Sequence, residues 1–206
     1  MAYLIIIAGL PATGKSVFAK YLCEKMKIPM ASKDSIKECL FDNIGFKSRQ
    51  EKVALGTAAM NLLYHFAELN LEAGRPVILE NNFENDSKPG LIKLIEKYRC
   101  KSVMVRFHTE LNVLYERLSE RDKSPDRHRG HVVNTCYPED ENIPAVTVEN
   151  MGFDNFYTGM KKRGMDNFSI GCEEIIVDST DFSKVDYDEI YGKVIRGLDL
   201  KNRLED

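Results

Sequence analysis

The segment from Gly9 to Ser16 combines glycine, lysine and serine at a spacing suited to holding phosphate groups. It reads Gly-Leu-Pro-Ala-Thr-Gly-Lys-Ser and fits the pattern G-x-x-x-x-G-K-[ST] at every fixed position. The glycines let the backbone curl so that its N–H groups point at phosphate oxygens, Lys15 can reach the β- and γ-phosphates of a nucleotide, and Ser16 can ligate Mg²⁺. We therefore predict a phosphate-binding loop formed by Gly9, Leu10, Pro11, Ala12, Thr13, Gly14, Lys15 and Ser16.

Two acidic residues follow short apolar runs that are typical of strands. Asp34 comes shortly after residues 28–31, and Glu80 ends residues 76–80. Ligands of open α/β proteins bind at the carboxyl edge of parallel strands, where both acids would lie. Asp34 could take the proton of an acceptor hydroxyl or hold that hydroxyl in line, and Glu80 could hold Mg²⁺ or its water. The alternatives are a helix cap at Asp34 and a simple strand-to-loop transition at Glu80.

Four arginines follow further along the chain. Arg117 and Arg121 lie four residues apart, on one face of a helix, where like charges repel unless an anion lies between them. A nucleoside triphosphate is such an anion, and the paired N–H donors of the arginine guanidinium suit phosphate oxygens. We predict that Arg117 contacts the nucleotide and that Arg121, with Arg127 or Arg129, neutralises charge during phosphoryl transfer. Because acidic residues are interspersed among these arginines, a solvated charged face is the alternative.

These candidate residues require a framework of alternating strands and helices. Apolar runs predict strands at about residues 3–8, 28–31, 76–80, 102–107 and 174–178. Apolar residues at three- and four-residue steps predict helices at about residues 15–26, 34–41, 49–73, 86–98, 111–120, 148–162 and 187–198. Such alternation implies a parallel sheet covered by helices on both faces. Residues 122–131 are polar and without a clear period, so we expect a mobile lid there.

Length and composition fit a single domain that spans residues 1–206. Of the 206 residues, 43% are apolar and 30% are charged, and the net charge is -3, as in ordinary globular proteins. A protein that coats nucleic acid through overall electrostatics would be basic, so that class is disfavoured. Five widely spaced cysteines without a C-x-x-C pair indicate reduced thiols in a cytoplasmic protein. No apolar run approaches the roughly 18 residues that span a membrane.

The motifs occur in a definite order along the chain. The loop GLPATGKS precedes Asp34, with Lys37 three residues on, and then the run AGRPVILE that ends at Glu80. The pattern E-R-L-x-x-R at residues 116–121, a basic segment and a final strand ending in Asp178 follow. This order resembles the small P-loop kinases of the AAA-like group. That group includes the kinase domain of polynucleotide 5′-kinase, chloramphenicol phosphotransferase and, more distantly, gluconate kinase and the zeta toxins.

The resemblance covers about residues 1–131 and 174–200. It implies a three-layer α/β/α P-loop NTPase fold with a five-stranded parallel sheet, ATP with Mg²⁺ as the phosphate donor, and Asp34 facing the acceptor hydroxyl. Lys37 stands where the polynucleotide kinases carry arginine, and the third strand ends in glutamate where aspartate is commoner. Residues 132–170 match nothing in that group, so we expect an acceptor-side insertion that sets specificity.

We therefore predict an ATP-dependent phosphotransferase that phosphorylates a hydroxyl of a small-molecule acceptor, with Asp34, Lys37 and Asn82 on the acceptor side. A nucleic-acid 5′-end kinase would use the same chemistry on another acceptor. The negative net charge of the chain argues against such a kinase. A nucleotide-binding regulator or toxin-like protein, whose hydrolysis serves as a switch, is the third possibility. A kinase should show slow ATP turnover that the correct acceptor accelerates many-fold, and a regulator should not.

Overall fold

The sheet consists of five parallel strands whose carboxyl ends share one edge. The computed structural model describes residues 2–144 and 152–200. The strands are β1 (Tyr3–Gly9), β2 (Met30–Ser32), β3 (Val77–Glu80), β4 (Lys101–His108) and β5 (Glu173–Asp178), in the order β2-β3-β1-β4-β5. Every pairing is parallel, which confirms the predicted sheet. Because β1 is the central strand, the loop that follows it lies in the middle of the carboxyl edge.

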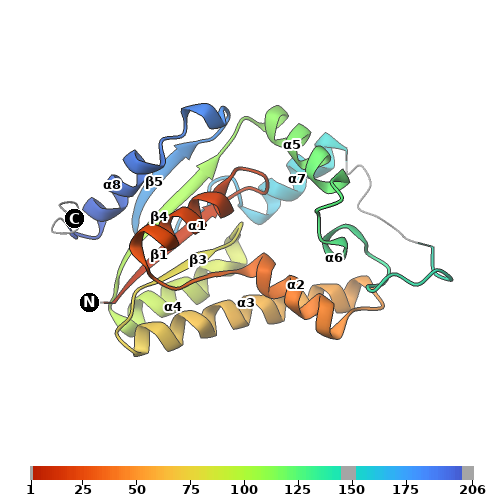
Figure 1. Cartoon of the computed structure of the whole chain (residues 1–206), viewed down its shortest axis with the longest axis horizontal. Helices are drawn as coiled ribbons and strands as arrows, with labels where there is room; N and C mark the ends of the chain where they lie inside the picture. Colours follow the sequence, from red (N-terminus) through yellow and green to blue (C-terminus); the bar gives the residue numbers. More distant parts are fainter. Residues whose placement is uncertain (1, 145–151, 201–206) are drawn as a thin grey trace.

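Helices cover both faces of the sheet and give three layers (Figure 1). The first face carries α1 (Lys15–Met26) and α8 (Tyr187–Gly197), and the second carries α3 (Arg49–Glu72) and α4 (Lys88–Tyr98). Successive side chains of a strand point to opposite faces. Accordingly, Ile5 and Ile7 of β1 join the core under α1 and α8, whereas Leu4 and Ile6 join the core under α3 and α4.

The other helical segments surround the carboxyl edge of the sheet. They are α2 (Lys33–Ile44), α5 (Leu111–Lys123), α6 (Arg129–Val132), α7 (Phe153–Arg163) and the 3₁₀ turns Asn85–Ser87 and Phe182–Lys184. Leu10, Leu114 and Met160 are buried together and join the loop after β1 to α5 and α7. The helix predicted at 148–162 would begin outside the described residues, and its described part is α7. Within residues 2–144 and 152–200, no helix has the length and apolar character needed to cross a membrane.

The segment predicted to be a mobile lid, residues 122–131, packs against α2. Gly130 of α6 lies so close to Phe41 that an added Cβ would come within 2.4 Å of the ring. His131 Nε2 lies 2.9 Å from Glu38 Oε1, which ties α6 to α2 a second time. The buried ring of Phe41 in α2 thus supplies the apolar surface against which the end of this polar segment packs. Movement of the segment when nucleotide binds stays a prediction.

Candidate functional site

The residues from Gly9 to Ser16 form a tight loop between β1 and α1. Gly9 (φ 137°) and Gly14 (φ 84°) adopt positive φ values that glycine tolerates. A Cβ at Gly9 would also come within 2.4 Å of a carbonyl oxygen of β4. Thr13 Oγ1 donates a hydrogen bond to Leu10 O at 2.8 Å and braces the loop. Gly14 is the N-cap residue of α1 and offers no side-chain hydrogen bond, so the first backbone N–H groups and the positive end of the helix dipole face the loop, as in an anion site.

Lys15 and Glu80 form a buried ion pair at the base of this loop. Lys15 Nζ lies 3.6 Å from Glu80 Oε1, and the two residues are 5% and 3% exposed. Glu80 ends β3, which lies between β1 and β2, so the ends of three strands meet at the pair. Burial lowers the pKa of Lys15, although Glu80 and then Asp34 oppose this shift. The exposed hydroxyl of Ser16 follows Lys15 in the first turn of α1.

Asp34 lies in the first turn of α2, and its side chain bonds to none of the residues that the structure describes. Because α2 begins at Lys33, Asp34 is not the cap residue. Its carboxylate makes no hydrogen bond or ion pair with any residue that the structure describes. Burial would raise the pKa of Asp34, but the surrounding basic side chains outweigh burial and lower it below the ordinary value. Those side chains, in decreasing order of effect, are His131, Lys15, Arg127 and Lys37.

Arg121 and Arg127 converge on the same region, from α5 and from the loop after it. Burial, followed by the positive charge of Arg121, lowers the pKa of Arg127. Arg121 Nη2 and Arg127 Nε lie 3.3 and 3.6 Å from the same oxygen of Asp122. Arg127 Nε is buried without a hydrogen-bond partner among the described residues. Two arginines thus share one carboxylate, and positive charge is left over beside Asp34.

Arg117 lies on the other side of the phosphate loop. Its guanidinium donates to two backbone carbonyls of the segment after β5, each at 2.8 Å, and stacks 3.8 Å from the ring centre of Phe182. The same ring covers Gly14, because a Cβ there would come within 2.9 Å of it. Arg117 and Phe182 therefore form a flat, half-exposed surface beside the loop.

The other predicted site residues, Arg129, Lys37 and Asn82, do not lie beside the phosphate loop. Arg129 makes two hydrogen bonds with Glu139, at 2.8 and 2.7 Å, on the surface. Lys37 follows Asp34 by one turn of α2, with its Nζ 5.2 Å from the ring centre of Phe41. Asn82 is half-buried just beyond β3.

The sequence analysis does not identify two residues of the site region, Phe182 and Lys52. Phe182 belongs to no motif, and only the packing of its 3₁₀ turn on the loop reveals it. Lys52 is buried in α3 and donates hydrogen bonds to carbonyl oxygens of His131 in α6 and of Val133 just after it. A signal for Lys52 exists, because it falls in phase with the buried stripe of α3, which continues through Ala59, Leu63, Ala67 and Leu71.

Fold and site together define a P-loop protein of the kinase-like type. The model of the AAA domain family matches residues 4–135, and the chain belongs to that family. No curated protein sequence matches the chain significantly.

Solved structures share the fold over nearly the whole chain. A presumed kinase from Chloroflexus aurantiacus is 26% identical, with 96% of each chain covered and a TM-score of 0.69. A gluconokinase from Sinorhizobium meliloti is 18% identical, covering 98% of this chain and 95% of its own, with a TM-score of 0.55. A shikimate kinase from Aquifex aeolicus is 14% identical, covering 98% and 99%, with a TM-score of 0.50. At the latter two identities the likeness concerns the fold alone.

Proposed function

We propose that the protein is an ATP-dependent phosphotransferase that moves the γ-phosphate of ATP to a hydroxyl of a small-molecule acceptor. The observation that carries this proposal is the carboxylate of Asp34, which makes no hydrogen bond or ion pair among the described residues and interacts electrostatically with Lys15 of the phosphate loop. A loop that binds phosphate needs no such acid, whereas transfer to a hydroxyl does. The fold likeness to kinases named for small molecules supports the same class.

The donor nucleotide would lie along the loop. Backbone N–H groups of the loop would hold its phosphates, with Lys15 at the β- and γ-phosphates. The flat surface of Arg117 and Phe182 would take the adenine base, because stacking suits a planar ring. In this arrangement Arg117 contacts the adenine base of the nucleotide, in line with the sequence prediction that Arg117 contacts the nucleotide.

The residues present fit a magnesium ion next to these phosphates. Ser16 offers an exposed hydroxyl and Glu80 a carboxylate, both hard oxygen donors. The part of the chain that the structure describes has no group of three His, Cys, Asp or Glu placed to hold a metal. Magnesium in such sites takes few protein ligands and binds largely through phosphates and water, so no such cage is needed. When bound, the ion would neutralise charge on the phosphate oxygens.

Asp34 would act on the acceptor. As the acceptor oxygen forms its bond to the γ-phosphorus, the bond from that phosphorus to the β–γ bridging oxygen breaks and ADP leaves. The proton of the acceptor hydroxyl passes to a carboxylate oxygen of Asp34. Arg121 and Arg127 would stabilise the negative charge spread over the transferring oxygens.

A metabolite screen tests this proposal. The protein is incubated with Mg·ATP and a pool of small metabolites, and new phosphorylated products are sought by mass spectrometry. We expect a product that Asp34→Asn fails to make, although this variant still binds a non-hydrolysable ATP analogue. ATP hydrolysis that the pool never accelerates, with no phosphorylated product, would contradict the proposal and favour the regulator alternative.

A further inference from the structure

Helix α3 carries a second set of apolar residues besides those that pack on the sheet. Leu63, Ala67 and Leu71 belong to the core under the helix. The second set recurs at three- and four-residue steps along another side of the helix, and we call it the apolar stripe: Leu55, Ala58, Leu62, Phe66 and Leu69. Leu62 is 45% exposed and Leu69 is 54% exposed, and the other three residues are half-buried.

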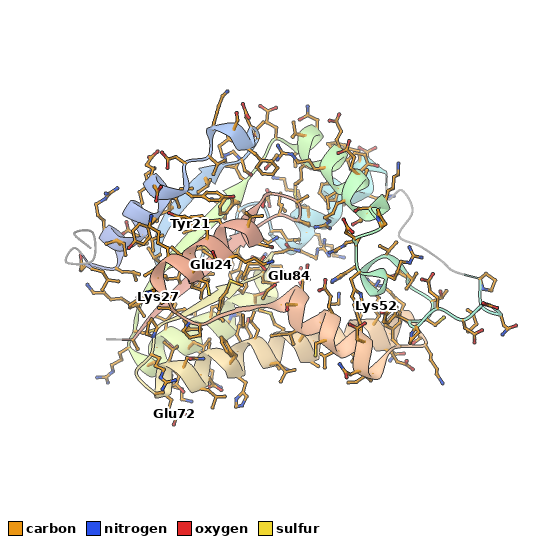
Figure 2. The ribbon with its side chains drawn as sticks, viewed as in Figure 1. Tyr21, Glu24, Lys27, Lys52, Glu72 and Glu84 are labelled. Atoms are coloured by element: carbon orange, nitrogen blue, oxygen red, sulfur yellow. The ribbon has the colours of Figure 1, made fainter. Side chains whose placement is uncertain are left out.

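The apolar stripe lies on the outside of the molecule. Figure 2 shows α3 along one long edge, with Lys52 towards one end and Glu72 at the other. Leu55 packs in part beside Phe41, and Phe66 packs in part on the core under α3. A single exposed leucine needs no partner. Five apolar residues aligned along one side of a helix indicate a docking surface.

The spacing of the stripe is symmetric about Leu62. Its successive steps are three, four, four and three residues, so the stripe reads the same from either end. Two copies of α3 laid antiparallel about a two-fold axis would place Leu62 against the partner's Leu62. Leu55 would then meet the partner's Leu69, and Ala58 would meet the partner's Phe66. A small residue facing a large one favours close packing, and a two-fold interface requires a surface that fits itself.

The charged residues at the two ends of the stripe fit the same arrangement. Glu51 continues the line of the stripe one turn before Leu55, and among the described residues its carboxylate bonds only to the backbone N–H of Lys47. Arg75 follows the opposite end of α3, is exposed, and makes no side-chain bond within the described ranges. Antiparallel pairing about Leu62 brings Glu51 opposite residue 73 of the partner, near the partner's Arg75. The same pair of opposite charges forms again at the other end of the interface.

We propose that α3 is the contact surface of a homodimer, in which the apolar stripes of two copies pack antiparallel about a two-fold axis at Leu62. The partner is a second copy of this chain because both the apolar spacing and the end charges match the stripe to itself. The stripe shares no residue with the phosphate loop or with the surroundings of Asp34. The dimer therefore does not rest on the proposed function.

Sedimentation of the full-length protein over a range of concentrations tests the dimer. We expect a reversible species with twice the mass of one chain. Leu62→Glu should raise its Kd at least about tenfold, because two like charges would face each other in the interface. Val53→Glu is the matched control. Val53 is 51% exposed on the same helix but lies nine residues from Leu62, about two and a half turns, so it points the opposite way. This control should dimerise as the wild type does.

Cross-linking gives a second measurement that needs no charge on α3. Cys39, an exposed cysteine, is first replaced by serine. Leu62→Cys in this background should form a covalent dimer with a short bis-maleimide, because position 62 meets its own copy. Val53→Cys should not, since it points away from the axis.

The outcomes decide the proposal. A wild type that stays monomeric at every concentration would overturn it and leave the stripe for a different protein. Equal weakening by Leu62→Glu and Val53→Glu, or equal cross-linking through positions 62 and 53, would also overturn it, because the contact would then lie elsewhere. Loss of the dimer in Leu62→Glu alone, with an unchanged thermal melt, would support the antiparallel pairing.

Discussion

The ammonium of Lys15 lies 3.6 Å from the carboxylate of Glu80, and both side chains are withdrawn from solvent. A buried charge is costly when its partner is removed, so each residue keeps the other in place. Since Lys15 belongs to the phosphate loop and Glu80 to the end of β3, the pair links the loop rigidly to the sheet. The position of the lysine is therefore set by the fold rather than by the nucleotide.

Replacing Lys15 with alanine should cut ATP turnover by at least about a hundredfold, because a positioned donor to the phosphates is lost. The variant should also unfold at a lower temperature, since Glu80 is left buried without its partner. Steady-state kinetics and thermal melts measure both effects, with Lys93→Ala as the control for loss of a surface charge. Turnover at the wild-type rate would refute the role given to the loop.

Asp34→Asn keeps the shape of the side chain and removes its capacity to accept a proton. Transfer to the acceptor should fall about 10²–10⁴-fold, while affinity for the ATP analogue stays near that of the wild type. Rapid-quench assays and calorimetry give the two quantities. An equal loss of nucleotide binding would place Asp34 in the metal site or in the framework of the fold.

Arg127 and Arg129 form a matched pair for testing the arginine assignment. Arg127→Gln should lower kcat at least about tenfold, equal to roughly 1.4 kcal/mol of barrier, because its guanidinium lies beside Asp34. Arg129→Gln should change kcat little, since Arg129 is paired with Glu139 on the surface. Equal losses in both variants would show that the segment rearranges and brings Arg129 to the phosphates.

Phe182→Ala tests the proposed site of the base. Loss of a stacking partner is worth about 1–3 kcal/mol per base, so KM for ATP should rise about tenfold or more while kcat with saturating ATP stays similar. Phe153→Ala, which removes another exposed ring, is the control. An unchanged KM would mean that the base lies elsewhere.

Lys52 should make stability depend on pH in a defined direction. Its pKa is about 7 in the folded protein and near the ordinary 10.5 in the unfolded chain. The unfolded chain therefore holds more protons between these values, and the free energy of unfolding rises with pH across that window. Lys52→Met should lack this contribution.

Urea unfolding at pH 6, 7, 8 and 9 measures the effect of Lys52. The gap between wild type and Lys52→Met should widen in favour of the wild type as pH rises above about 7. Both proteins keep the charged side chains that act on the ammonium of Lys52, which are Lys37, Arg49, Arg127 and Asp122. Parallel pH curves would show that Lys52 keeps its ordinary pKa.

Local patterns in the sequence predict most of the framework. Apolar runs locate all five strands, and the phosphate loop follows from its motif. The meeting of Glu80 with Lys15 follows from parallel topology, because carboxyl ends of neighbouring strands share an edge. The spacing of apolar residues predicts the length of α3 but not which of its faces is buried. Val53 and Leu69 belong to the apolar pattern yet are more than half exposed, whereas Ala59 and Ala67 are buried.

Contacts between distant segments account for what the sequence does not predict. Lys52 and His131 are 79 residues apart, and no local pattern indicates that one bonds to the other. Arg117 and Arg121 share a helical face in the sequence, yet the guanidinium of Arg117 turns to Phe182, 65 residues further on. Such pairings depend on how helices pack, which spacing along the chain does not encode.

The central position of β1 also affects how the protein is made. This very apolar strand is made before the other four strands of the sheet, yet its neighbours in the sheet begin only at Val77 and Lys101. At about 5–20 residues per second, β1 waits several seconds before either neighbour exists. Throughout that interval the two backbone edges of β1 lack the strands that pair with them in the folded sheet. We expect the newly made β1 to need shielding by a chaperone, and slowed synthesis between β1 and β3 to increase aggregation.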